Sequence, residues 1–150
     1  ELTDEMKLDP SSNNLYRLKK GIMRYFASPG KLELEIAAFC ERKKIRWALW
    51  PQMDRYDVEI QFSDGEIWEI DAKAYRNPIA LRTKIQNDNG FPDGEYARGY
   101  FVIPSEYTVN QQNYTAIVNR ILENQKNVKC VTLQSLKAEI TRKEDSCCEG

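Results

Sequence analysis

The stretch that decides the fold reads Asp57-Val-Glu-Ile-Gln-Phe-Ser-Asp-Gly-Glu-Ile-Trp-Glu-Ile-Asp71-Ala-Lys73. Hydrophobic and polar residues alternate on both sides of a central Ser-Asp-Gly, which is typical of a β-hairpin with a tight turn. A two-residue turn at Asp64-Gly65 would leave neither face apolar, because Val58 and its neighbours would share a face with Asp71. The alternation therefore argues against that register.

A three-residue turn, Ser63-Asp64-Gly65 with glycine in the left-handed conformation, pairs Ile60 with Trp68 and places Asp57 opposite Asp71. A slip of one residue would mix the two faces, so burial selects this register. One face is then apolar and consists of Val58, Ile60, Phe62, Trp68, Ile70 and Ala72. The other face carries the charged groups, which are Asp57, Glu59, Glu69, Asp71 and Lys73.

Two directly opposed aspartates have Cβ atoms roughly 4.5–5.5 Å apart and repel each other unless a cation lies between them. Mg²⁺ suits such a pair, because it binds one or two carboxylates and is completed by water and substrate phosphate oxygens. Lys73 projects to the same side and can stabilise charge that develops on a phosphate. The alternative is a solvated strand face with a surface ion pair worth about 0–1 kcal/mol. The opposed aspartate favours the metal site.

With these residues the chain resembles the PD-(D/E)xK nuclease superfamily. The resemblance covers about residues 31 to 133 and implies an α/β fold, a restriction-endonuclease-like αβββαβ core with a mixed central sheet flanked by helices. The sequence pattern supplies these elements in order. We expect a helix at 31–44, a strand at 45–50, the two hairpin strands, a helix near 78–87, a strand at 99–103, a helix at about 110–124 and a strand at 128–132.

The resemblance also implies the chemistry. Asp57 and Asp71 correspond to metal ligands, Lys73 to the catalytic lysine, and the carbonyl of Ala72 to a further ligand, with Mg²⁺ as the metal and Mn²⁺ as a substitute. One position departs from the family pattern, because Tyr56 stands where a proline precedes the first aspartate.

The helix at 31–44 offers two further acids. Glu33 has apolar residues at +3, +4 and +7, which places it on the core-facing stripe, and its spacing to Asp57 is similar to that in archaeal Holliday-junction resolvases and Mrr-like members. We favour Glu33 as a metal ligand and catalytic residue, while Glu35 stays open. For either acid the alternative is stabilisation of the first helical turn by about 0.3–1 kcal/mol.

Composition narrows the function. With 150 residues and 41% hydrophobic content, the chain suits a single folded domain. The absence of histidine excludes Ser-His-Asp catalysis, HNH-type nucleases and histidine-ligated zinc. Cys40, Cys130, Cys147 and Cys148 lack paired C-x-x-C spacing, and no signal peptide or apolar run of membrane-spanning length is present, so we expect reduced thiols and a cytoplasmic location with no membrane contact.

A net charge of −1 and a pI near 5.7 argue against DNA binding over the whole surface. Basic residues are clustered, however, and the group nearest the site predicts phosphate contacts by Arg76, Arg82 and Lys84. The alternative is that these are solvated helix faces. The run at 87–98 is rich in turn formers and predicts an exposed loop beside the substrate groove.

We therefore expect three segments: an N-terminal amphipathic helix and linker at 1–30, a nuclease domain at 31–142 and a flexible tail at 143–150. The expected function is Mg²⁺-dependent hydrolysis of DNA phosphodiester bonds in prokaryotic restriction, antiphage defence or repair, by a homodimer or as part of a larger multidomain protein or complex. Two alternatives stay open: a catalytically silent binding module with the same fold, and an RNA-cleaving enzyme.

Overall fold

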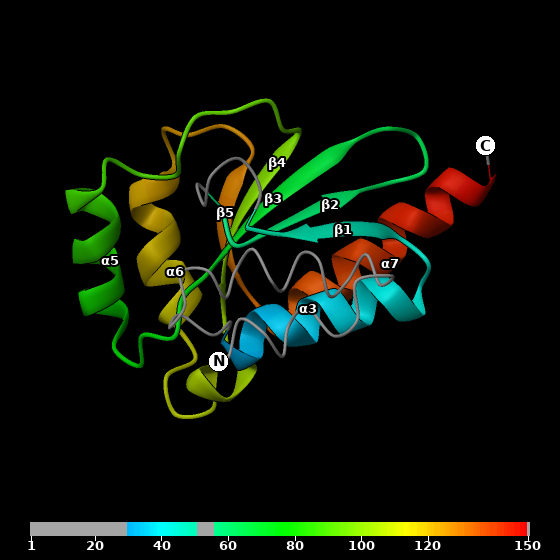
Figure 1. The fold of residues 1–150 in the computed structure, drawn as a ribbon. Helices are drawn as coiled ribbons and strands as arrows, with labels where there is room; N and C mark the ends of the chain where they lie inside the picture. The colour runs from blue at the N-terminus through cyan, green and yellow to red at the C-terminus, as the bar shows by residue number, and fades with distance from the viewer. Residues whose placement is uncertain (1–29, 51–55, 150) are drawn as a thin grey trace, which may run out of the picture.

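A computed structural model of the chain describes residues 30–50 and 56–149 and shows one five-stranded sheet with helices on both faces (Figure 1). The expected N-terminal helix lies outside the described residues. In chain order the elements are α3 (Lys31–Arg42), β1 (Arg46–Leu49), β2 (Val58–Gln61), β3 (Ile67–Ala72), α5 (Pro78–Asn87), β4 (Arg98–Ile103), η1 (Ser105–Thr108), α6 (Tyr114–Asn119), η2 (Arg120–Leu122), β5 (Val128–Thr132) and α7 (Leu133–Glu149).

The sheet is mixed, with strand order β1-β2-β3-β4-β5. The first three strands are antiparallel, whereas β3, β4 and β5 run parallel. The hairpin has the predicted register, with Ile60 opposite Trp68. Its turn closes through a hydrogen bond from the Phe62 N–H to the Glu66 carbonyl (2.9 Å), and Gly65 adopts φ of 92°, which glycine tolerates without strain. The predicted three-residue turn is confirmed.

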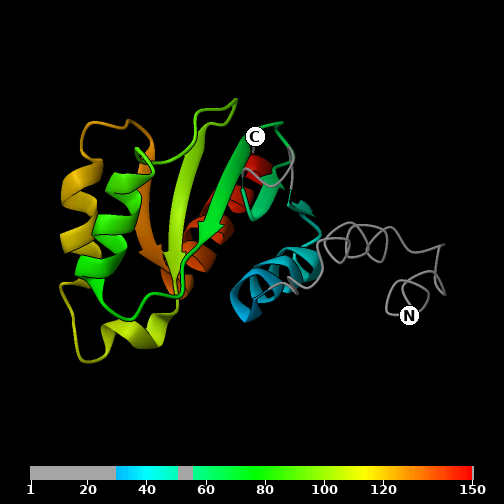
Figure 2. The same ribbon diagram turned by 60° about the vertical axis from the view of Figure 1, so that its left-hand side comes forward.

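The fold has three layers, a sheet between two pairs of helices, and one hydrophobic core lies on each face of the sheet. Helices α3 and α7 lie side by side against one face of the sheet, and α5 and α6 lie together against the other (Figures 1 and 2). The apolar hairpin face, represented by Val58, Ile60 and Trp68, is buried under α3 and α7. Phe101 and Cys130 face α5 and α6. Since Asp71 is the register partner of Phe101, its side chain belongs to the α5 and α6 face.

The restriction-endonuclease-like α/β architecture expected from the sequence is confirmed, with small differences at helix ends. Helix α3 ends at Arg42 because Lys44 takes a positive φ of 60°, which stops the helix. The segment expected as one helix at about 110–124 is a shorter α6 followed by the 3-10 turn η2. None of the described helices is long and apolar enough to cross a membrane.

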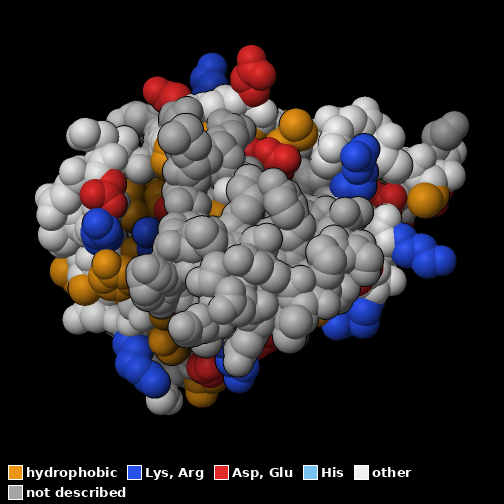
Figure 3. Space-filling view, viewed as in Figure 1, with side chains coloured by type: hydrophobic (Ala, Val, Ile, Leu, Met, Phe, Trp, Pro, Cys, Tyr) orange, Lys and Arg blue, Asp and Glu red, His pale blue; other side chains and the backbone are white. Residues whose placement is uncertain are grey.

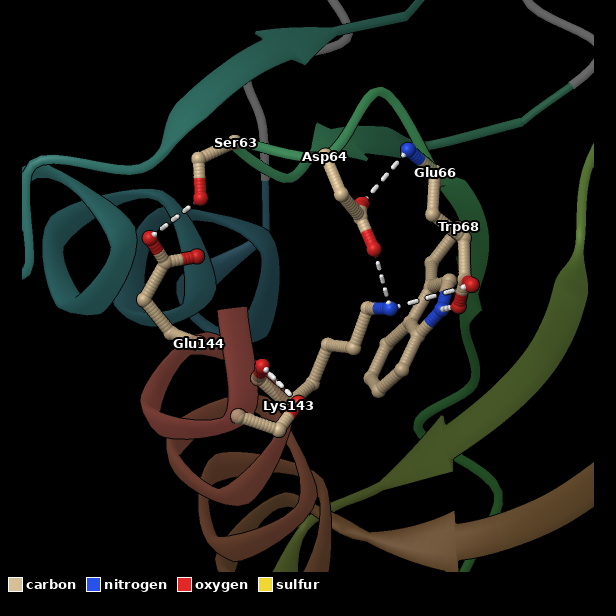
Figure 4. A network of polar contacts seen from close by, with 7 residues as sticks. Ser63, Asp64, Glu66, Trp68, Lys143 and Glu144 are labelled. Carbon is tan, nitrogen blue, oxygen red and sulfur yellow. Dashed lines mark hydrogen bonds and ion pairs between the residues drawn. The ribbon is translucent and has the colours of Figure 1, made fainter. Parts of the chain in front are cut away.

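The expectation of a flexible tail at 143–150 is corrected by the structure, in which α7 continues as a helix through Glu149. A polar network ties this part of α7 to the hairpin turn (Figure 4). Lys143 Nζ contacts Asp64 Oδ2 at 2.6 Å and Glu66 Oε2 at 3.1 Å, and Ser63 Oγ donates to Glu144 Oε1 at 3.1 Å. The charged end of α7 is therefore held in place by the hairpin turn, which is far away in the sequence.

Candidate active site

The hairpin and the parallel strand pair together position the two predicted aspartates. Asp71 lies on β3, and Asp57 immediately precedes β2, with its N–H donating to the Ile70 carbonyl at 2.9 Å. The Asp57 carbonyl accepts a hydrogen bond from the Trp50 N–H at 2.8 Å. Its carboxylate accepts one from the Ala72 N–H at 2.7 Å. Asp57 is thus fixed between β1 and the end of β3.

Lys73 joins this pair one residue beyond β3. Its N–H donates to the Val102 carbonyl at 2.8 Å, which extends the parallel pairing with β4 past the end of the strand. The Lys73 ammonium lies 3.2 Å from Asp71 Oδ1, and the two side chains are only 19% and 18% exposed. Such burial does not fit the alternative of a solvated strand face with a surface ion pair.

Burial dominates the electrostatics of the aspartates. Loss of hydration raises the pKa of Asp71 from 3.8 to about 7; the Lys73 charge opposes this shift, while the charge and hydrogen bond of Asp57 add to it. Burial also raises the pKa of Asp57, against the lowering effect of its hydrogen bonds with Ala72 and Asp71. Without metal, these raised pKa values favour one proton on the pair below about pH 7, and a cation can replace that proton.

Glu33 interacts electrostatically with Asp71 and Lys73, and it also caps helix α3. Burial raises its pKa, the negative charge of Asp71 adds a smaller effect, and the Lys73 charge opposes both. Its carboxylate accepts a hydrogen bond from the Gly30 N–H and so caps the start of α3, which is the acidic half of a capping box. The structure therefore brings Glu33 within electrostatic reach of the site while engaging it as a helix cap. Its role as a metal ligand stays a prediction, as does the choice over Glu35.

The oxygen donors of the site suit a hard divalent cation. Among residues 30–50 and 56–149, no three Asp, Glu or Cys side chains gather closely enough to hold one metal ion. Two carboxylates are sufficient for Mg²⁺, which takes its remaining ligands from water and phosphate. Asp57 and Asp71 are half-buried and within hydrogen-bond distance of each other, so once both are ionised a cation between them would relieve their repulsion. The residues present fit the predicted metal.

A second carboxyl pair lies next to the first along the hairpin, and the sequence analysis did not anticipate its burial. Glu59 and Glu69 are register partners, and Glu69 is fully buried. Burial raises the pKa of Glu69 to about 9, with the hydrogen bond and the charge of Glu59 adding to the shift. The polar face of the hairpin is thus an acidic ladder whose inner member is removed from water.

Tyr56, which stands where the PD-(D/E)xK resemblance would have a proline, is the other residue whose role the sequence did not reveal. Its side chain is 1% exposed and stacks on Phe91, with ring centroids 5.5 Å apart. The hydroxyl donates to the Asp93 carbonyl at 3.0 Å. The residue before Asp57 therefore anchors the loop between α5 and β4, and Phe91, in a segment expected to be exposed, is buried.

The predicted phosphate contacts occupy the α5 side of the site. Arg76 is exposed and lies 5.1 Å from the centre of the Tyr107 ring. Arg82 and Lys84 are on α5, where Lys84 pairs with Asp88 at 3.1 Å. That pairing is the main cause that raises the pKa of Lys84, and the Asp71 charge contributes slightly. On the face shown in Figure 3, charges of both signs are scattered among the described side chains rather than gathered by sign.

A mixed sheet of this topology, with two carboxylates and a lysine at the end of its central strand, defines the class as a restriction-endonuclease-like domain. Residues 30–146 match the model of the family described as "REase associating with pPIWI_RE", where REase denotes restriction endonuclease. The match covers most of the chain, so the chain belongs to this family, a nuclease-type family. Comparisons with curated proteins and with solved structures gave no match.

Proposed function

We propose that the chain is a divalent-metal-dependent endonuclease that hydrolyses DNA phosphodiester bonds. The observation that carries the proposal is the half-buried pair Asp57 and Asp71 with Lys73 at 3.2 Å from Asp71. Membership in a restriction-endonuclease family supports the reaction class. The proposed resident metal is Mg²⁺, with Mn²⁺ as a substitute.

Asp57 and Asp71 would hold the ion, and the Ala72 carbonyl is proposed as a further ligand. Glu33 does not form a three-acid cluster with them in the described residues, and we propose that it joins the ligands when metal binds. When bound, a divalent ion supplies Lewis-acid polarisation of the phosphate and lowers the pKa of a coordinated water. The protein's contribution is to hold the ligands rigidly: the Ala72 N–H fixes Asp57, and the β3–β4 pairing fixes the backbone of Lys73. Such fixed positions remove the cost of reorganising the site during reaction.

Lys73 acts on the substrate side of the pair. Its ammonium has three donors, of which the contact with Asp71 uses one. The others are available to a phosphate oxygen, where the positive charge stabilises the negative charge that develops during attack. Partial burial strengthens this effect, because water screens a half-buried charge less than an exposed one.

The biological setting follows from the family description. The family is named for association with pPIWI_RE, and we propose that this chain works with such a protein in prokaryotic defence, supplying the cutting activity of the complex. A chain with a net charge of −1 binds DNA weakly by itself. A partner that holds the nucleic acid would therefore supply much of the affinity.

The direct test is cleavage of supercoiled and linear DNA with Mg²⁺ or Mn²⁺ by the wild type and by Asp71→Ala and Lys73→Ala. Metal-dependent cutting that both variants lose supports the proposal. Cutting that survives in both variants assigns the activity to another site or a contaminant. If no form cuts, with or without the partner, the chain is a silent module; cutting of RNA alone would assign it to the RNA-cleaving class.

A further inference from the structure

The polar face of β1 and β2 carries two side chains that the proposed chemistry does not use. Arg46 and Gln61 are register partners across the two strands. Within the described part of the chain, neither side chain has a hydrogen-bond or ion-pair partner. Arg46 is exposed and Gln61 is half-buried. Their donors and acceptors are therefore available to a ligand.

These two residues line a pocket of about 260 Å³, together with Trp47, Ala48 and Glu59. Glu59 is the register partner of Glu69, and Glu69 alternates with Asp71 on the same face of β3. The pocket is thus on the same face of the sheet as the catalytic pair. Gln61 is four residues beyond Asp57, which corresponds to roughly 13 Å along the strand.

We propose that this pocket binds an unpaired guanine base of the substrate strand, an inference that rests on the proposed nuclease function. Guanine offers two acceptors, O6 and N7, which match the donors of Arg46 and the amide of Gln61. It also offers two adjacent donors, N1–H and the N2 amino group, which match the two oxygens of a carboxylate such as Glu59. No other common base places two donors side by side on this edge.

The charge of the pocket favours a base over a phosphate. The Glu59 carboxylate lines it, so a phosphate group at this place would meet like charge. A base edge is neutral and needs both donors and acceptors, which Arg46, Gln61 and Glu59 supply together. The hydrogen bond between Glu59 and Glu69 occupies only one of about four acceptor positions on the carboxylate.

The proposal also defines the form of the substrate. The N1 and N2 donors of guanine are buried in base pairing within a duplex, so the pocket requires a single-stranded or unpaired region. At about 3.4 Å per stacked nucleotide, the separation from Asp57 places this guanine no more than about four nucleotides from the scissile phosphate. The preferred substrate is therefore single-stranded or branched DNA with a guanine beside the cut.

Binding without metal tests the pocket separately from catalysis. Fluorescence anisotropy in EDTA compares labelled thymidine oligonucleotides that carry one central guanine, inosine, adenine or thymine. We expect the guanine oligonucleotide to bind about tenfold more tightly than the thymine one. Inosine, which lacks the N2 amino group, falls between them. Equal affinity for all four, or no binding of any, overturns the proposal.

Variants locate the effect. Arg46→Ala and Gln61→Ala should reduce the guanine preference to less than about twofold, and circular dichroism confirms that they fold. Arg120→Ala, which removes an exposed arginine of η2, is the matched control for charge and should keep the preference. A preference that survives in both pocket variants overturns the proposal. DNA cutting without guanine preference disproves only the pocket, whereas guanine binding by a chain that never cuts disproves only the nuclease function.

Discussion

The carboxylate of Asp57 accepts a hydrogen bond of 2.7 Å from the backbone N–H of Ala72, the residue that follows Asp71. One aspartate is thereby fixed by the backbone of the strand that carries the other. The antiparallel pairing of β2 with β3 ends at Val58 and Ile70. Asp57 therefore lies just beyond the regular pairing, where its side chain can turn toward the end of β3 without leaving the hairpin.

Metal binding should depend on pH. Burial raises the pKa of Asp71 to about 7 in the metal-free protein, so a proton occupies the pair below that pH. Since ion and proton compete for the same oxygens, the apparent Kd for Mn²⁺ should rise about tenfold for each pH unit below 7 and level off above it. Isothermal titration calorimetry between pH 5.5 and 8 measures this. A Kd independent of pH over that range would contradict the assignment.

The same raised pKa predicts how the metal-free fold responds to pH. The unfolded carboxyl has its ordinary pKa of 3.8, so between about 4 and about 7 the folded state binds more protons than the unfolded state. The stability that this carboxyl contributes is complete below its unfolded pKa of 3.8. It is lost as the pH rises through its folded pKa of about 7. Asp71→Asn, which cannot ionise, should flatten this part of the profile, as urea midpoints at several pH values would show.

Lys73→Met should abolish most cutting while leaving metal binding intact. Methionine keeps the length of the side chain but removes the charge 3.2 Å from Asp71. A loss of about 10²–10³-fold in cleavage rate is expected for removal of one group that stabilises the transition state. Lys126→Met is the matched control, because Lys126 is exposed between η2 and β5 and belongs to none of the proposed contacts. Equal rates for the two variants would contradict a catalytic role for Lys73.

Two substitutions separate the possible tasks of Glu33. Glu33→Gln retains an oxygen that accepts the Gly30 hydrogen bond but removes the negative charge, whereas Glu33→Ala removes both. If Glu33 ligates metal, Gln weakens Mn²⁺ binding while changing the unfolding free energy by less than about 0.5 kcal/mol. Ala should also destabilise by about 0.5–2 kcal/mol.

Calorimetry and urea unfolding of Glu33→Gln, Glu33→Ala and Glu35→Gln give the answer together. Glu35→Gln is the matched control, since Glu35 lies in the same helix and is the other candidate. Unchanged Mn²⁺ binding in Glu33→Gln would restrict Glu33 to its helix cap. Weakened binding in Glu35→Gln alone would transfer the ligand role to Glu35.

The hairpin was predictable because a period-two pattern with one buried face permits a single register. The pattern does not reveal which residues of the polar face lose contact with water. Glu69 occupies a charged position by alternation, and yet it is fully buried. That burial depends on the surroundings of β3 in three dimensions, about which strand periodicity carries no information.

Contacts between residues far apart in the sequence explain why the sequence did not reveal the role of Tyr56 or the helix at the C-terminal end. Tyr56 owes its position to Phe91 and the carbonyl of Asp93, which belong to the loop after α5. The charged segment after residue 142 has the composition of a tail, but an apolar stripe at Leu136 and Ile140 packs the helix on the core. Composition describes one segment at a time, whereas these partners come from other elements.

The Lys143 contact with the hairpin turn should contribute stability that depends on pH. The hydrogen bond with Lys143 is the main cause that lowers the pKa of Asp64 below 3.8. The contribution of Asp64 to stability is therefore complete above its unfolded pKa of 3.8, and it is lost as the pH falls through its lower pKa in the folded protein. Lys143→Met, which keeps the aliphatic stem, should lower the urea midpoint at pH 7, and the difference from the wild type should shrink toward pH 3.

Hydrogen exchange places this effect on the hairpin. The Gly65 N–H donates to the Phe62 carbonyl across the turn, so its exchange should accelerate in Lys143→Met at pH 7. Lys126→Met, at an exposed lysine between η2 and β5, controls for the loss of one charge and should leave both the midpoint and the exchange rate unchanged. A midpoint difference that persists unaltered at pH 3 would mean that Lys143 stabilises the fold by packing and not through Asp64.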